Sequence, residues 1–166
     1  MLVLGVDPGT AITGYGLVRE DDGELTLAAC GVITTSADLP LAERLAIIYR
    51  RLSELIAEHR PQAVAVEQLF FSRNVRTALA VGQARGVALL AAAHAGLPVA
   101  EYTPLQVKQA VVGYGQADKA QVQEMVRVVL RLDAVPQPDD AADAVAVAVC
   151  HLHSARWFDV LAARGG

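Results

Sequence analysis

The sequence has few cysteines, few charged residues and few aromatic residues for its length. Among 166 residues there are two cysteines, 19% charged side chains and 5% aromatic ones, whereas 54% are hydrophobic. Cys30 and Cys150 stand in separate apolar segments, which excludes a disulfide framework or a cysteine zinc knuckle and favours a reducing, cytoplasmic location. The apolar composition excludes a disordered chain. The length suits one domain, and we assign residues 1–166 to it.

The sequence also lacks a long hydrophobic run and several common catalytic motifs. Its longest charge-free stretch, Gly86–Ala100, is interrupted by a histidine, a glycine and a proline, so we expect no membrane span. Asp7 interrupts the apolar run Met1–Val6, which argues against a secretory signal. There is no GxGxxG, Walker A, GxSxG or HExxH pattern, so dinucleotide, P-loop, serine-hydrolase and zinc-protease chemistry is not indicated.

Negative charge predominates overall, but the charge is unevenly distributed. The net charge is −4, yet Gln68–Arg131 contains seven basic and three acidic residues. A positive face that binds nucleic acid is one interpretation of this block. Ordinary solvated helix surfaces are the other.

Apolar patterning predicts an α/β domain with a mixed sheet. Three strands joined by short turns are expected to form an antiparallel meander, and two further strands alternate with helices. The expected strands are Leu2–Val6, Thr13–Val18, Leu25–Thr35, Ala63–Val66 and Leu97–Tyr102. The expected helices are one from Leu41 that Pro61 ends, then Asn74–Ala95, Pro104–Val112, Asp118–Leu132 and Asp139–His153. Asp118 and Gln121 form a capping-box pattern at one of these helix starts.

Two acidic residues are expected at strand ends. Asp7 follows the first strand and Glu67 follows the fourth. Ligands bind at the carboxyl ends of strands in α/β sheets, so both carboxylates would face one crevice if these strands are parallel neighbours. Asp7 could also serve only in the Asp-Pro-Gly turn, and Glu67 only as an acid at a loop start.

A second acidic pair occurs at the start of the last helix. Asp140 and Asp143 are three residues apart and share one helix face. Asp139 and Asp140 could simply stabilise the helix N-terminus. Asp143 lies in an otherwise apolar stretch with no lysine or arginine within one helical turn, so we expect a positive partner from elsewhere, most simply a metal ion.

The four carboxylates would bind divalent cations if they converge. Two carboxylates about 4 Å apart repel by about 4 kcal/mol at an effective dielectric constant near 20. Oxygen-only ligands select Mg²⁺ or Mn²⁺ over Zn²⁺. Two such ions can catalyse phosphodiester cleavage.

Residues after Glu67 suit nucleic acid. Phe70 and Phe71 precede Arg73 and Arg76, so a ring could stack on an unpaired base while the arginines neutralise phosphates. For Phe71 we favour a place in the core.

The only two lysines offer a second candidate DNA contact. Lys108 and Lys119 lie on either side of Gly113-Tyr114-Gly115 and could contact a phosphate backbone.

An ordered set of short motifs resembles one known family. They are Gly5-Val6-Asp7-Pro8-Gly9, Val66-Glu67-Gln68, Gly82-Gln83-Ala84-Arg85-Gly86, Gln106-Val107-Lys108-Gln109 and Asp140-Ala141-Ala142-Asp143-Ala144. Over roughly residues 1–153 the chain resembles the RuvC family of bacterial Holliday junction endonucleases.

The resemblance implies a fold, a reaction and a set of site residues. The fold would be RNase H-like, with a five-stranded mixed sheet flanked by helices. Asp7, Glu67, Asp140 and Asp143 would be catalytic ligands of two Mg²⁺ ions, for which Mn²⁺ could substitute. Phe70 would stack in the junction, and Lys108 and Lys119 would contact DNA.

The resemblance also implies partners. A homodimer would make paired symmetric nicks across a four-way DNA junction in recombination and repair, alongside the RuvA–RuvB branch-migration complex. We place the dimer contact on the helix Asn74–Ala95, whose small and apolar residues could pack against a second copy.

Three other functions share some of these residues. An RNase H-like nuclease acting on RNA–DNA hybrids or RNA would use the same acids without a dimer. A non-catalytic junction-binding protein would not need the acids. An actin-like phosphotransferase has a similar Asp7-Pro8-Gly9-Thr10 turn but requires two such domains.

Overall fold

The protein is an α/β structure built on one sheet. A computed structural model describes residues 1–68 and 74–164. The elements in chain order are β1 (Leu2–Asp7), β2 (Ile12–Asp21), β3 (Glu24–Thr34), α1 (Leu41–His59), β4 (Ala63–Glu67), α2 (Val75–His94), β5 (Val99–Tyr102), α3 (Pro104–Val112), α4 (Lys119–Val129) and α5 (Asp139–Arg164). This order confirms the predicted succession of strands and helices.

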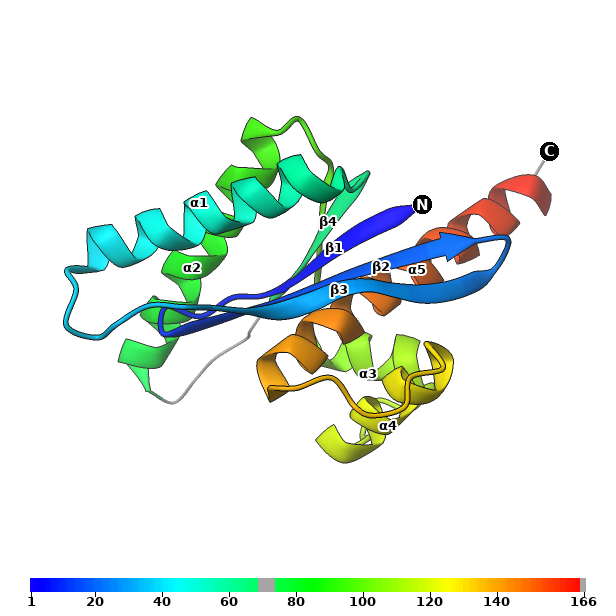
Figure 1. Ribbon diagram of the computed structural model, residues 1–166. Helices are drawn as coiled ribbons and strands as arrows, with labels where there is room; N and C mark the ends of the chain where they lie inside the picture. The colour runs from blue at the N-terminus through cyan, green and yellow to red at the C-terminus, as the bar shows by residue number, and fades with distance from the viewer. Residues whose placement is uncertain (69–73, 165–166) are drawn as a thin grey trace.

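The sheet is mixed and has the strand order β3-β2-β1-β4-β5 (Figure 1). β1, β2 and β3 form the expected antiparallel meander, whereas β4 runs parallel to both β1 and β5. β1 and β4 are therefore adjacent and parallel. The residues that end these two strands thus lie at the same edge of the sheet.

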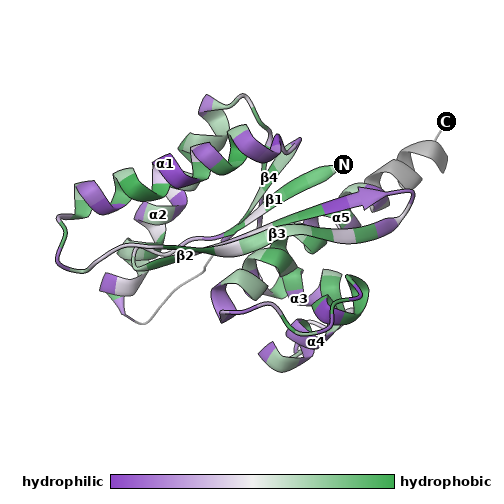
Figure 2. Ribbon diagram, viewed as in Figure 1, coloured by the Kyte–Doolittle hydropathy of each residue, from purple (hydrophilic) through white to green (hydrophobic). Residues whose placement is uncertain are grey.

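Helices cover both faces of the sheet. Figure 1 shows α1 and α2 on one side and α3, α4 and α5 on the other. Side chains alternate accordingly: Leu4 and Val6 of β1 pack in the core beneath α1 and α2, whereas Val3 packs in the core beneath α5. In Figure 2 β1 is largely hydrophobic, while α1 alternates between hydrophobic and hydrophilic residues as an amphipathic helix does.

Two helix ends differ from the prediction. α4 ends at Val129 rather than Leu132, because the chain turns into the left-handed region at Arg131, where φ is 54°. α5 continues to Arg164 rather than ending at His153. No glycine or proline follows His153 before Gly165, so nothing in the sequence stops this helix earlier.

A helix that crosses a membrane must be both long and apolar. Within the part of the chain that the structure describes, no helix combines the length and the hydrophobicity that crossing a membrane requires.

Candidate functional site

The first two predicted acids lie side by side at the ends of neighbouring strands. Asp7 is the last residue of β1 and Glu67 is the last residue of β4. The parallel register pairs Val6 with Val66, so the next residues along both strands are these two acids. Because side chains alternate along a strand, both acids project toward α5, opposite to Val6 and Val66. Their carboxyl groups share a hydrogen bond.

The second pair of acids is brought to the first by close packing of α5 against the sheet. A Cβ atom on Gly14 would lie 1.9 Å from the backbone oxygen of Asp140, and one on Gly5 would lie 2.1 Å from that of Ala144. Both glycines therefore permit a backbone contact that no other residue would allow. Gly14 pairs with Asp7 across β1 and β2, so Asp140 is held above the strand position next to Asp7.

Burial and mutual repulsion raise the pKa of three of these acids. Burial, together with the negative charges of Glu67 and Asp143, raises the pKa of Asp7 from its ordinary value of 3.8 to about 9. Burial also raises the pKa of Glu67 and of Asp143. Asp140 contributes to the repulsion felt by Asp7 and Asp143. Each of the four predicted acids thus acts electrostatically on at least one of the others, as expected for one cluster.

A lysine from another helix supplies one positive partner of Asp143. The Nζ atom of Lys119, at the start of α4, lies 3.3 Å from Oδ2 of Asp143 and 3.3 Å from Oδ2 of Asp139. The sequence showed no cation within one helical turn of Asp143 because this one comes from a different helix. Burial opposes the charge of Lys119, but Asp143 and Asp139 outweigh that effect and raise the pKa of its amine.

A cavity of about 250 Å³ opens between these groups. Its lining includes Glu67, Asp143, Lys108 and Lys119. The two lysines predicted to contact DNA are therefore adjacent to the acids, although they are eleven residues apart in the chain. The negative charge of Glu67 is also stabilised by Lys119 and Lys108, which partly offset the effect of its burial.

The donor chemistry of the cluster fits a divalent cation, although the side chains as placed do not surround one. Within residues 1–68 and 74–164, no three histidine, cysteine, aspartate or glutamate side chains are arranged to hold a metal ion together. Instead Asp7 and Glu67 share a hydrogen bond, and Asp143 pairs with Lys119. A proton and an ammonium group thus relieve the repulsion that a divalent cation would also relieve.

The remaining predicted DNA contacts are only partly described. Arg76 is exposed in the first turn of α2 and lines a second cavity of about 400 Å³ with Gly9 and Ile12, in the segment that follows Asp7. Phe70 and Arg73 lie outside the described residues.

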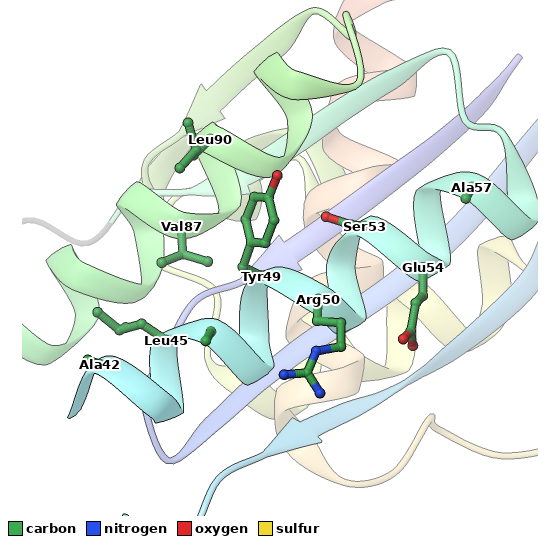
Figure 3. Close-up of a pocket in the computed structure, with 10 residues that line it drawn as sticks. Ala42, Leu45, Tyr49, Arg50, Ser53, Glu54, Ala57, Val87 and Leu90 are labelled. Atoms are coloured by element: carbon green, nitrogen blue, oxygen red, sulfur yellow. The ribbon is translucent and has the colours of Figure 1, made fainter. Parts of the chain in front are cut away.

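On the opposite face of the sheet, α1 and α2 form an apolar groove of about 760 Å³ (Figure 3). Tyr49 extends from α1 toward α2, and Val87 points back toward α1. Tyr49 also contacts His94 through its hydroxyl group and ring edge, which joins the two helices.

Next to this groove, the outer surface of α2 is apolar and open. Val75, Leu79 and Leu90 are 72%, 60% and 48% exposed. A Cβ atom on Gly82 or on Gly86 would meet nothing within 4 Å. All five positions fall on one face of the helix.

The roles of Gly14 and Lys119 in assembling the site were not predicted from the sequence. Glycine inside a strand often marks close backbone approach, and Gly14 and Gly16 in β2 are such a signal. The pairing of Lys119 with Asp143 had no signal, because the two residues are far apart in the chain.

Known proteins resemble this chain over nearly its whole length. Residues 3–151 match the family model described as "Crossover junction endodeoxyribonuclease RuvC". The protein of that name from Roseiflexus sp. is 63% identical over 92% of this chain and 90% of its own length. The corresponding protein from Pelotomaculum thermopropionicum is 60% identical over 95% of this chain and 96% of its own.

Solved structures agree with these matches. Thermus thermophilus RuvC in complex with a Holliday junction substrate superposes with a TM-score of 0.91 at 43% identity, covering 95% of this chain and 96% of that chain. The yeast mitochondrial Holliday junction resolvase Ydc2 shares the fold, with a TM-score of 0.65 at 12% identity over 91% of this chain and 78% of that chain.

Proposed function

The chain belongs to the RuvC family of crossover junction endodeoxyribonucleases, and from this premise we propose how its acids resolve four-way DNA junctions. The observation that carries the proposal is the convergence of Asp7 and Glu67, from adjacent parallel strand ends, on Asp143 of α5. We assign Asp7, Glu67, Asp140 and Asp143 as the catalytic residues.

The enzyme depends on divalent metal, as its family membership implies, and we propose that the four acids hold two Mg²⁺ ions. Four carboxylates form an oxygen-only donor set, which suits Mg²⁺ or, as a substitute, Mn²⁺. When bound, the cations supply Lewis acidity toward the scissile phosphate and stabilise the attacking and leaving oxygens.

The protein's own residues set the charge of this site. The proton that Asp7 shares with Glu67 must leave before both carboxylates act as ligands, because the ligand form of a carboxyl group is the negatively charged carboxylate. Lys108 lies beside Glu67 in the lining of the cavity, where its amine can hold a phosphate oxygen of the bound strand close to the acids.

DNA contacts outside the acids are proposed on a similar basis. Arg76 is exposed next to the loop that follows Asp7, so it can neutralise a phosphate of the strand entering the site. For Phe70 and Arg73 the proposal rests on the sequence and on the family: a ring that stacks on an unpaired base and a cation next to it.

A second copy of the chain is the proposed occupant of the open face of α2. Leu79 and Leu90 flank the segment Gly82–Gly86, so the helix presents apolar side chains on either side of two positions without side chains. Two such helices can pack closely about a two-fold axis. A dimer supplies two symmetry-related sites, which paired cuts across a junction require.

The biological setting follows from the family alone. We propose action in the cytoplasm, together with the RuvA–RuvB branch-migration complex. Both cysteines are free thiols, in keeping with a reducing compartment. We also propose that residues 1–166 form a single nuclease domain, because all the acids of the site lie on one sheet and the helix packed against it.

The experiment that tests the proposal is cleavage of a synthetic mobile four-way junction with and without Mg²⁺, with an RNA–DNA hybrid duplex as the alternative substrate. We expect paired nicks in the junction that require Mg²⁺, and no cleavage of the hybrid. Glu67→Gln and Asp143→Asn keep the side-chain shape while removing charge, so each should abolish cleavage yet leave junction binding intact. Cleavage by either variant at the wild-type rate would refute the assignment of the acids.

A further inference from the structure

Lys119 contacts two acids, only one of which is a proposed metal ligand. Its Nζ atom lies 3.3 Å from Asp143, one of the four proposed ligands, and 3.3 Å from Asp139, which is not one of them. The side chain of Asp143 is 29% exposed and that of Asp139 is 58% exposed. The amine thus bridges the inner acid cluster and an outer acid at its edge.

The outer acid is held in place from both sides. While Oδ2 of Asp139 faces Lys119, its Oδ1 accepts a hydrogen bond of 3.2 Å from the Nε2 atom of Gln123. Gln123 and Lys119 lie one turn apart on α4, whose start is fixed by the capping box between Asp118 and Gln121. Two side chains at the start of α4 therefore hold the carboxylate of Asp139, the first residue of α5. In the contact between Asp139, Lys119 and Asp143, the flexible part is the lysine side chain.

A divalent cation bound to Asp143 would compete with Lys119 for that carboxylate, because the amine already lies 3.3 Å from its Oδ2 atom. Two positive charges cannot both lie against the Asp143 carboxylate without strong repulsion. When a cation binds there, the lysine amine must move, and Asp139 is the carboxylate that it already contacts.

Resting on the proposed function, we propose that Lys119 is an exchangeable counter-ion of the acid cluster and that Asp139 is its positioning residue. Lys119 neutralises Asp143 until a divalent cation replaces it. Asp139 then retains the amine at the edge of the cavity that Lys119 lines. Asp139 acts through Lys119 and not as a ligand.

A simpler role for Asp139 makes a different prediction. An acid in the first turn of a helix stabilises the helix by its charge alone. In that case, replacing Asp139 would lower the thermal stability of the protein, but its effect on cation binding would not depend on Lys119.

The test is a double-mutant cycle read out by Mg²⁺ binding to the full-length protein without DNA. Wild type, Lys119→Met, Asp139→Asn and the double variant are treated with EDTA, dialysed and titrated with Mg²⁺ by calorimetry at one pH and ionic strength. Thermal unfolding with and without Mg²⁺ gives a second measurement. Asp133→Asn removes the same charge from the exposed loop before α5 and serves as the matched control.

We expect opposite effects from the two single variants. Ion pairs this exposed change an equilibrium constant by up to about fivefold, so Lys119→Met should tighten Mg²⁺ binding by about that factor and Asp139→Asn should weaken it by about threefold. In the Lys119→Met background, Asp139→Asn should have no more effect than Asp133→Asn. Unchanged or weaker binding by Lys119→Met, or an equal effect of Asp139→Asn in both backgrounds, would overturn the inference.

Failure of the inference can be told apart from failure of the proposed function. If the wild type binds neither Mg²⁺ nor Mn²⁺, the proposed cation centre is wrong and the inference falls with it. If the wild type binds Mg²⁺ and all variants bind it alike, only the inference is wrong. If Lys119→Met does not fold by circular dichroism, Lys119→Gln replaces it in the same cycle with the same expected direction.

Discussion

The two faces of the sheet are packed in different ways. On the face that carries the acids, α5 lies against β1 and β2 almost backbone to backbone, with Gly5 and Gly14 beneath it. On the other face, larger side chains such as Ile48 and Leu52 of α1 fill the space above the sheet. There the groove between α1 and α2 remains open, and the outer side of α2 exposes Leu79 and Leu90.

The difference shows what each face has to do. Acids from different elements can share cations only if the helix that carries two of them is fixed within a fraction of an ångström of the strands. Contacts through glycine fix that distance, because a backbone has no rotamers to adjust. The opposite face keeps an apolar surface open, and it is there that we propose a second copy of the chain packs.

The largest effect is expected from adding one methyl group beneath α5. Gly14→Ala would place its Cβ atom 1.9 Å from the Asp140 oxygen, so the first turn of α5 must move away from Asp7. We expect a loss of about 100-fold in cleavage rate and of about 1–3 kcal/mol in the free energy of unfolding. Junction-cleavage kinetics and urea denaturation measure the two losses.

Gly16→Ala is the matched control for this variant. A Cβ atom there would lie 2.5 Å from Cγ2 and 2.8 Å from the backbone N and Cα atoms of Val145, farther along the same helix from Asp140. A similar loss of stability with a much smaller loss of cleavage would support a specific role for Gly14. Equal losses of cleavage in both variants would mean that the tight packing serves stability alone.

The next largest effect is expected from adding a side chain to the open face of α2. Within the subunit, a Cβ atom on Gly86 meets nothing within 4 Å and the position is exposed, so we expect Gly86→Leu to fold normally but to block close approach of a second α2. We expect a monomer by analytical ultracentrifugation, with paired cuts replaced by single nicks or by none. Ala120→Leu adds similar bulk at an exposed position of α4, on the other face of the sheet, and should leave the dimer intact. A dimeric Gly86→Leu protein would remove α2 from the proposed interface.

A smaller effect should appear in the pH dependence of stability without divalent cations. The pKa of Asp7 rises from 3.8 to about 9 in the folded protein, so the folded state keeps a proton that the unfolded state releases. The stabilisation is complete below about pH 4 and is lost as the pH rises toward 9, so the melting temperature in EDTA should fall over this range. Glu67 and Asp143, whose pKa values are also raised, act in the same direction.

Two further measurements test this explanation. Mg²⁺ should reduce the pH dependence of the melting temperature, because a bound cation replaces the proton. Asp7→Asn should remove the part of this pH dependence that Asp7 contributes. A melting temperature in EDTA that stays constant or rises with pH would contradict the raised pKa.

The smallest effect should come from a single proposed DNA contact next to the acids. Lys108→Ala should weaken junction binding a few-fold and reduce its salt dependence by about one phosphate contact. Fluorescence anisotropy over a series of salt concentrations measures both quantities. Arg51→Ala removes an exposed positive charge from α1 on the other face and should change neither. If both variants lose the same salt dependence, the acid-bearing face is not the DNA-binding face.

Local patterns in the sequence were sufficient for much of the fold. Alternating apolar residues and turn signals predicted the order of strands and helices, and Asp118 with Gln121 forms the predicted capping box. The expectation that Asp7 and Glu67 end neighbouring parallel strands is confirmed. Their roles as ligands remain predictions. Helix ends were less accurate, since the left-handed turn at Arg131 and the continuation of α5 depend on more than the apolar pattern.

The sequence by itself determined which residues could carry charge at the end of each element, because strand and helix periods are local properties of the chain. Only the tertiary structure decided which charges meet. Lys119 reaches Asp143 because α4 and α5 start side by side, and Asp140 lies close to Asp7 because Gly14 lets two backbones touch. Such contacts join residues many positions apart, and their energies depend on distance and burial, which no local pattern contains.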